Sequence, residues 1–151
     1  MKFSKMDKEH GAKYIISFRK AKKLYKNYIE RDLSIYDLSE NEIEIIMCLN
    51  RNPIKNTAKD LVEYLGLSKG MISRTIDQLV AKEILEFEKD KKDKRIYRLK
   101  ISDKSNKLIE DLEVSSERFF SGLIKNVDND RLETFASVLE DMIINMKELE
   151  K

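Results

Sequence analysis

Five residues between positions 68 and 74 have side chains and spacing suited to reading duplex DNA: Ser68, Lys69, Gly70, Ser73 and Arg74. The free amides at the start of a helix, together with Lys69, favour phosphate. Arg74 can donate two hydrogen bonds to a guanine edge in the major groove, which shows a distinct pattern for each base pair. Gly70 allows DNA to approach the backbone closely, although neutral tolerance explains it equally well.

A second candidate surface is the charged segment 89–95, which holds five cations and two anions. The candidate DNA contacts in it are Lys91, Lys92, Asp93, Lys94 and Arg95. A narrow minor groove has an enhanced negative potential, and Lys94 or Arg95 could insert there. The segment has neither Gly nor Pro, which predicts a long, mobile hairpin tip and not a tight turn. A merely solvated loop is the alternative.

Two short helices must position the first candidate. Thr57 with Asp60 indicates the start of a helix over residues 58–65, and Gly66 stands where a left-handed backbone is needed to end it. Ser68 then caps a helix that runs to about Glu83. The apolar stripe of this second helix comprises Ile72, Ile76, Leu79 and Val80. The candidate contacts lie on the opposite face, which is left for water or for a groove.

Two strand patterns must position the second candidate. Apolar and polar residues alternate over 84–88 and again over 97–101, on either side of the charged segment. A helix–turn–helix followed by a β-hairpin is the plan of a winged-helix DNA reader. Residues 56–102 are therefore the part of the chain around which the rest is organised.

Two helices are predicted before this part. Apolar spacing indicates a first helix over residues 8–32. Ser39 with Glu42 forms a capping box that starts a second helix, and Asn52-Pro53 ends it. Between residues 9 and 30 the first helix has six Lys or Arg and no acidic residue. That edge faces phosphate or an anionic ligand, or it is simply solvated.

Two further helices are predicted after the hairpin. One opens at Ser102 and runs to about Val127, and Asp130 with Glu133 has the capping-box spacing that starts the last helix. A helix over residues 103–127 is about 37 Å long and overshoots a compact unit of about fifty residues. Pairing with a second copy across a two-fold axis buries the excess apolar surface most simply. An intramolecular three-helix bundle is the alternative.

Composition excludes several classes of protein. His10 is the only histidine, so the sequence predicts neither a catalytic dyad nor a histidine-rich metal site, and it has no phosphate-binding glycine motif. We expect no enzymatic activity, cofactor or metal. No apolar run approaches the roughly 18 residues of a membrane span, and the polar start lacks a signal-peptide core. The single cysteine, Cys48, fits a reducing cytoplasm, so we expect a cytoplasmic protein without a membrane partner.

The sequence resembles the MarR family, the multiple-antibiotic-resistance type of winged-helix transcriptional regulator. The resemblance covers residues 8–149 and is most specific in L-x-x-x-L-G-L-S-K-G-M-I-S-R-T-I-D-Q-L, which begins at Leu61. The wing motif Asp93-Lys94-Arg95 and the segment 99–104 complete it.

The resemblance implies one domain over residues 1–151. Within it, residues 38–102 form the DNA-binding winged helix–turn–helix, and residues 8–37 and 103–151 supply the dimerisation helices. It also implies a repressor, or less often an activator, on a pseudo-palindromic operator. In many members a small aromatic or anionic effector binds between the two parts and releases DNA. First-helix aromatics such as Phe18 and Tyr25 could line that pocket, although core or dimer packing also explains them.

The sequence departs from the family pattern at the ends of elements. The family usually has Gly where Glu83 and Ser105 stand, and Leu-Thr where Ile101-Ser102 stand. These changes concern local turn geometry. Zinc-sensing members carry several histidines, and peroxide-sensing members place a cysteine near the first helix, so neither branch fits this chain well. Cys48 lies in an apolar run, which indicates a core residue.

We therefore predict a mostly α-helical protein with a small β-hairpin wing (α+β). Its expected function is that of a homodimeric, sequence-specific DNA-binding transcriptional regulator, a repressor released by a small-molecule effector. Two alternatives remain. One is a dimeric ligand- or protein-binding module of the same fold that does not read DNA. The other is a redox-responsive regulator that senses oxidants through Cys48.

Overall fold

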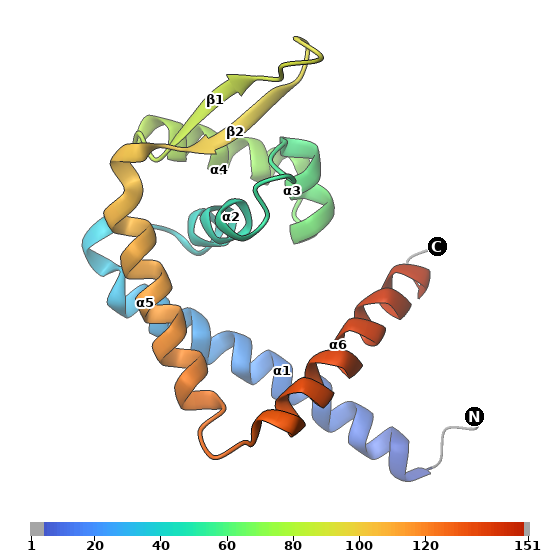
Figure 1. Cartoon of the computed structure of the whole chain (residues 1–151). Helices are drawn as coiled ribbons and strands as arrows, with labels where there is room; N and C mark the ends of the chain where they lie inside the picture. The colour runs from blue at the N-terminus through green and yellow to red at the C-terminus, as the bar shows by residue number, and fades with distance from the viewer. Residues whose placement is uncertain (1–4, 150–151) are drawn as a thin grey trace. The chain divides into compact units, whose positions relative to one another are not determined.

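The structure is a computed structural model that describes residues 5–149, with side chains from His10 onward. It has six α-helices and a two-stranded antiparallel sheet within the described residues, which confirms the predicted fold class (Figure 1). Residues 1–4 and 150–151 of the expected domain lie outside this range. No helix between residues 5 and 149 is long and apolar enough to cross a membrane.

The chain divides into two compact units, one up to residue 117 and one from residue 118. The single domain over residues 1–151 therefore stays a prediction. In the first unit, α2 (Glu40–Arg51) lies at the centre and contacts α3 (Ala58–Leu65), α4 (Lys69–Ala81) and the second strand (Figure 1). This unit holds the expected helix–turn–helix and hairpin.

The helix starts of this unit follow the predicted caps. Ser39 and Glu42 form a reciprocal capping box at the start of α2, and Thr57 and Asp60 form another at the start of α3. Each box satisfies two amides that the first helical turn leaves without a backbone partner. Gly66 ends α3 with φ of 66°, a left-handed conformation in which glycine avoids the cost of a side chain.

Helix α4 begins as predicted and ends two residues early. Ser68 accepts a hydrogen bond from the amide of Met71, and the last helical residue is Ala81. Glu83, which was expected inside the helix, has φ of 57°. The backbone therefore turns into the left-handed region at the position where the MarR family usually has glycine.

The wing is a short hairpin with a simple register. Strands β1 (Leu85–Lys89) and β2 (Tyr97–Ile101) pair so that Leu85 faces Ile101 and Phe87 faces Leu99. Leu85 and Leu99 are buried, and they anchor the base of the hairpin to the core. β1 starts one residue later than predicted because Ile84 donates its amide to the carbonyl of Leu79 at the end of α4.

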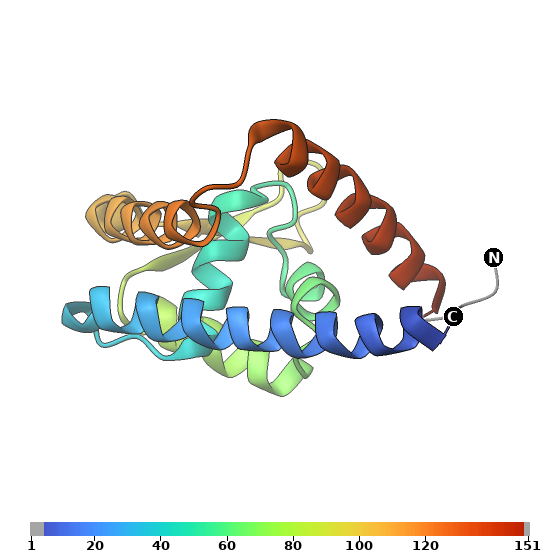
Figure 2. The ribbon, with the colours of Figure 1, turned by 90° about the horizontal axis from the view of Figure 1, so that it is seen from below.

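The core joins the winged part to the end of α1 (Lys5–Asp32) and to the start of α5 (Asn106–Leu123). Figure 2 shows α1 as one uninterrupted helix. The fully enclosed apolar side chains are Ile29, Leu33, Ile45, Ile46, Leu61, Ile72 and Leu79. They come from α1, α2, α3 and α4 and from Leu33, which directly follows α1, so burial of apolar area holds these four helices together.

Polar contacts also tie α1 and the following short helix η1 (Ser34–Tyr36) to α5. Ser115 donates to the carboxylate of Asp32 at 2.7 Å, and Ser115 is buried. The hydroxyl of Tyr36 donates to Asp111 at 2.5 Å. Buried hydroxyls need such partners, since an unpaired one costs free energy. No pattern in the sequence predicted η1.

The helices after the wing differ from the prediction at three points. A 3-10 turn, η2 (Asp103–Ser105), precedes α5, and α5 ends at Leu123 and not near Val127. Asn126, at φ 69°, stands in the loop that follows. The last helix, α6 (Asn129–Leu149), is capped by Asp128, whose carboxylate accepts the amide of Arg131 at 3.0 Å. The expected cap at Asp130 is therefore wrong, because Asp130 already lies inside the helix.

Candidate nucleic-acid interface and adjoining pocket

One face of α4 is exposed along its whole length. The exposed residues of this face include all five predicted contacts: Ser68, Lys69, Gly70, Ser73 and Arg74. On the opposite face Ile72, Ile76 and Leu79 are buried against the core. The side chains of Lys69 and Arg74 form no hydrogen bond or ion pair with any described residue, so both are available to a ligand. The predicted division of α4 into a core face and an open face is confirmed.

Neither packing nor backbone conformation within the chain requires glycine at position 70. A Cβ added to it would meet no atom within 4 Å, and its φ is not positive. Folding of the chain therefore does not require glycine at this position. Close approach of an external partner and neutral tolerance both remain consistent with it.

The wing tip carries the second group of predicted contacts. All five residues from Lys91 to Arg95 are exposed, and none of the four cations among them pairs with a described acidic residue. Figure 1 shows the hairpin projecting beyond α4, and both elements lie in the first compact unit. Several unpaired cations on one projecting loop create a positive potential that attracts a polyanion.

The loop at this tip is better organised than the sequence indicated. Oδ1 of Asp90 accepts the amides of Lys92 and Asp93, both at 2.8 Å. The carboxylate of Asp93 accepts the amide of Arg95 at 3.0 Å. The expected mobile tip is therefore a hydrogen-bonded loop, and Asp93 acts on its backbone. Aspartate commonly bonds an amide two residues ahead, and the spacing of these residues could have indicated it.

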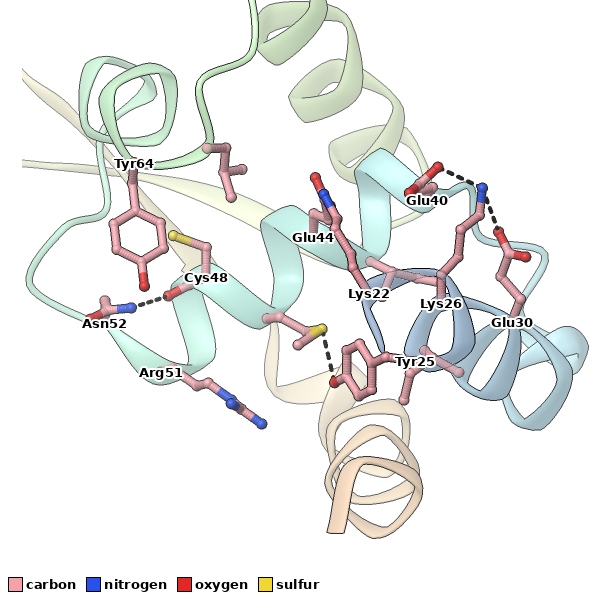
Figure 3. Close-up of a pocket in the computed structure, with 14 residues that line it drawn as sticks. Lys22, Tyr25, Lys26, Glu30, Glu40, Glu44, Cys48, Arg51, Asn52 and Tyr64 are labelled. Atoms are coloured by element: carbon pink, nitrogen blue, oxygen red, sulfur yellow. Dashed lines mark hydrogen bonds and ion pairs between the residues drawn. The ribbon is translucent and has the colours of Figure 1, made fainter. Parts of the chain in front are cut away.

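A pocket of about 260 Å³ lies between α1, α2 and α3 (Figure 3). Tyr25 from α1 and Tyr64 from α3 line it, with Cys48 and Arg51 from α2. The remaining lining residues are Lys22, Lys26, Ile29, Glu30, Glu40, Ile43, Glu44, Met47, Asn52 and Leu65. An apolar cavity of about 150 Å³ is enough to bind benzene. This pocket therefore has room for one substituted aromatic ring.

Most charges in the pocket lining are compensated internally. Lys26 lies 2.6 Å from a carboxylate oxygen of Glu40 and 3.7 Å from Glu30, and Lys22 lies 3.0 Å from Glu44. The hydrogen bond to Glu40 raises the pKa of Lys26 above its ordinary value, which keeps the ammonium charged. Arg51 is the one lining cation without an acidic partner among the described residues. A bound anion would find its counter-charge there.

The two aromatic residues predicted for an effector pocket are placed differently. Tyr25 lines the pocket, and its hydroxyl lies 2.8 Å from Oγ of Ser116 on α5. Phe18 does not line it and is 47% exposed. Arg51 and Tyr64 were missed, because only packing of α3 against α2 brings them to the same cavity. No spacing pattern in the sequence carries that information.

Cys48 lacks the properties of a redox sensor. Its side chain is 4% exposed, and burial raises the pKa of its thiol above the ordinary value. A sensing thiol needs exposure and a lowered pKa. The structure therefore favours the expected core role and disfavours the redox-responsive alternative. Within the described residues, no group of three or more His, Cys, Asp or Glu is placed to hold a metal ion.

The winged part and the whole fold match known regulators. Residues 38–97 match the MarR family model. A MarR transcriptional regulator from Methanosarcina mazei is 24% identical, with a TM-score of 0.75 over 93% of this chain and 99% of that one. The DNA complex of MepR from S. aureus is 16% identical, with a TM-score of 0.74 over 88% and 96% of the two chains.

A third similar structure carries a small molecule. It is the organohalide-sensing regulator RdhR-CbdbA1625 in its 2,4-dichlorophenol-bound form, 15% identical with a TM-score of 0.64 over 87% of this chain and 78% of that one. At these identities the structures establish the fold, and the family model establishes the winged part. Residues 38–97 thus match the MarR family, and the chain as a whole has the fold of the winged-helix transcriptional regulators to which it is similar.

Proposed function

We propose that this chain binds a pseudo-palindromic operator in duplex DNA as a homodimer and represses transcription until a small aromatic or anionic effector releases it. The observation that carries the proposal is the open face of α4, where Lys69 and Arg74 have no partner among the described residues. Four unpaired cations on the wing tip extend the same surface. The DNA complex of MepR, a protein of the same fold, supports this use of the surface.

In this arrangement the two surfaces have separate tasks. The amide end of α4 and Lys69 hold phosphate, and Arg74 reads a base edge in the major groove. Lys94 and Arg95 reach the neighbouring minor groove, where an ordered loop presents them. In a two-fold dimer the two copies of α4 would lie about one DNA turn, ~34 Å, apart.

Uncovered apolar side chains support the homodimer. No residue of α6 is buried, and Phe135 and Val138 are 53% and 50% exposed. On α1, Ile15 and Ile16 are 72% and 57% exposed. Apolar surface on this scale marks an interaction site. A second copy is the partner that always accompanies the chain, and two-fold pairing closes without leaving free ends.

Charge supports the same pairing. Residues 10–26 of α1 carry six Lys or Arg and no acidic residue, whereas α6 carries five acidic and two basic residues. Opposite charge on two helices with uncovered apolar faces favours contact between them across a dimer. The basic edge of α1 would then meet acidic side chains of the partner and not phosphate. Size-exclusion chromatography with light scattering measures the oligomeric state, and a monomer at micromolar concentration would contradict the proposed homodimer.

The DNA part is tested by selecting operators for the full-length protein from a random duplex library. Fluorescence anisotropy then gives the affinity as a function of salt. We expect log K to fall with log salt by about 0.9 for each neutralised phosphate. Lys94→Ala and Arg95→Ala should each lower that slope by about one unit. Arg74→Ala should reduce discrimination against a wrong base by about 1–3 kcal/mol.

A matched control lies outside both surfaces. Lys104 pairs with Glu83 at 2.8 Å and is exposed, so Lys104→Ala removes one cation without touching α4 or the tip. It should leave affinity and slope unchanged. If the dimeric protein retains no duplex at low salt, the alternative of a ligand- or protein-binding module is correct. In a transcription assay with a selected operator placed over a promoter, added protein should lower the transcript level.

The effector part concerns the pocket between α1, α2 and α3. Tyr25 and Tyr64 provide aromatic walls, and Arg51 provides the counter-charge for a phenolate or carboxylate. The solved relative with bound 2,4-dichlorophenol makes that phenol a suitable probe. We expect 2,4-dichlorophenol to bind to the protein and to lower its affinity for the operator. Arg51→Gln should lower the affinity for the phenol and leave the affinity for the operator unchanged when no phenol is present. Equal phenol binding by both proteins would contradict this use of the pocket.

A further inference from the structure

The inference concerns Asp90, an acidic residue in the middle of the basic wing. Its carboxylate is 13% exposed, although it stands at the end of a projecting hairpin. Oδ1 accepts the amides of Lys92 and Asp93, and Oδ2 receives the guanidinium of Arg98. The amide of Asp93, the guanidinium of Arg98 and the amide of Lys92 together hold the pKa of Asp90 well below its ordinary value. The carboxylate is therefore charged at neutral pH.

Arg98 connects this loop to the body of the winged part. Its second nitrogen, Nη1, donates to the side chain of Asn56 at 2.7 Å. The carbonyl of Asn56 in turn accepts the amide of Leu99 at 2.7 Å. Asn56 stands just before the cap of α3, so the link joins the tip, the second strand and the start of the helix–turn–helix. These contacts constrain both the shape of the loop and its direction.

The remaining backbone of the loop is closed by two hydrogen bonds. The amide of Asp90 donates to the carbonyl of Ile96, and the amide of Ile96 donates to the carbonyl of Asp93, both at 3.0 Å. A loop ordered before binding loses less conformational entropy when it binds, which strengthens the complex. The unpaired cations at its apex are thus presented by a structure that Asp90 organises.

We propose that Asp90 and Arg98 are positioning residues of the wing, which hold the tip cations in the conformation that contacts DNA. This inference rests on the proposed DNA-binding function. The inference predicts that the loss of one negative charge lowers the affinity for DNA. Removal of a carboxylate near a polyanion strengthens attraction when only net charge matters. Here removal of the Asp90 carboxylate weakens DNA binding, because the lost order of the loop outweighs the gained charge.

The chain offers a matched control for this expected weakening of DNA binding. Glu88 stands two residues before Asp90 on β1, is exposed, and forms no hydrogen bond or ion pair with a described residue. Glu88→Gln removes the same charge from the same hairpin without touching the loop. Asp90→Asn keeps an oxygen for the amides of Lys92 and Asp93 but loses the ion pair with Arg98. Asp90→Ala loses both.

The experiment measures the affinity of the full-length variants for a selected operator by fluorescence anisotropy. We expect Glu88→Gln to bind as tightly as the unaltered protein or more tightly. Asp90→Asn should bind several-fold more weakly, and Asp90→Ala about tenfold more weakly, which is the effect of disordering one or two residues at an interface. Thermal unfolding of each variant checks that the core is intact.

A double-mutant comparison separates positioning from other roles. In a Lys94→Ala, Arg95→Ala background, Asp90→Ala and Arg98→Met should have little further effect, since few positioned cations remain. If the variants lose as much operator affinity in that background as they do alone, the proposal is overturned. For Arg98→Met, such a loss would show that Arg98 contacts DNA itself. Equal or tighter operator binding by Asp90→Ala would also overturn it.

Hydrogen exchange of the tip gives a readout that does not involve DNA. The amides of Lys92 and Asp93 should exchange slowly in the unaltered protein and faster in Asp90→Ala. Slow exchange that Asp90→Ala leaves unchanged would overturn the positioning role even when DNA binding is normal. Failure of the unaltered protein to bind any duplex would instead refute the proposed function, and with it this inference, whatever the exchange rates are.

Discussion

The ammonium of Lys82 lies 2.9 Å from Oε1 of Glu42 and donates a hydrogen bond of 3.0 Å to Oε2. Glu42 is 3% exposed, and its Oε2 also accepts the amide of Ser39 at 2.8 Å. The same ammonium donates to the carbonyl of Asp37 at 2.6 Å. Lys82 caps the end of α4, so one cation ties this helix to the start of α2.

Loss of that cation should destabilise the protein. Lys82→Met keeps the apolar stem but leaves a buried carboxylate without its partner. Breaking a buried pair costs about 3–5 kcal/mol, and the cost here should be nearer 2 kcal/mol because the Lys82 side chain is 35% exposed. Urea unfolding measures the change. Lys104→Met, which breaks an exposed pair with Glu83, is the control and should have little effect. If the two substitutions lower the free energy of unfolding equally, burial of Glu42 does not strengthen its pair with Lys82.

Acid should destabilise the winged part. Burial alone would raise the pKa of Glu42, but the amide of Ser39 and the ammonium of Lys82 outweigh it and lower the pKa below 4.5. The hydroxyl of Thr57, and then its amide, lowers the pKa of Asp60 below 3.8 despite burial. A carboxyl with a lowered folded pKa stabilises the protein above its unfolded pKa, and this stability is lost as pH falls further. Unfolding free energy should thus drop from about pH 4.5 downward.

Glu42→Gln separates the contribution of Glu42 from the rest of this acid effect. The variant should be less stable at pH 7, since it lacks the ion pair with Lys82. Its stability should also fall less steeply below pH 4.5, because one of the groups that titrates there is gone. Urea unfolding at several pH values gives both quantities. If the unfolding free energies of the two proteins change in parallel with pH, the pKa of Glu42 is not lowered in the folded state.

Glycine at position 83 should raise the melting temperature. Glu83 has φ of 57°, where a residue with a side chain is strained and glycine is not. Glu83→Gly also loses an exposed pair with Lys104 and gains freedom in the unfolded chain, which together offset part of the benefit. We expect Tm to rise by about 2 °C, as measured by calorimetry. Glu83→Ala should lower Tm, and a lower Tm for both variants would contradict the strain.

Cys48 should react slowly with thiol reagents. The side chain is 4% exposed and burial raises its pKa, so little thiolate is available. Native protein should react with a disulfide reagent such as DTNB far more slowly than glutathione does at pH 7.5. Urea-unfolded protein should react at the rate of glutathione. Fast reaction of the native protein, together with oxidant release of DNA that Cys48→Ser abolishes, would restore the redox-responsive alternative.

The sequence alone determined those features that depend on near neighbours. Capping boxes at Ser39 and Thr57, the left-handed turn at Gly66 and the two faces of α4 follow from contacts within a few residues, and local spacing reveals them. The strands are likewise visible as alternation. Where local signals competed, prediction went wrong, as at Asp130, because Asp128 offers the same carboxylate two residues earlier.

Tertiary structure decided the features that join distant segments. Arg51 and Tyr64 share a pocket, Lys82 reaches Glu42 across 40 residues, and Arg98 reaches Asn56 across 42. Each depends on how helices pack and on which polar groups are buried in the process. The order of the wing tip also belongs here, since Asp90 needs Arg98 from the opposite strand. Local residue types show which groups can pair, but only the packed chain brings the partners within hydrogen-bonding distance.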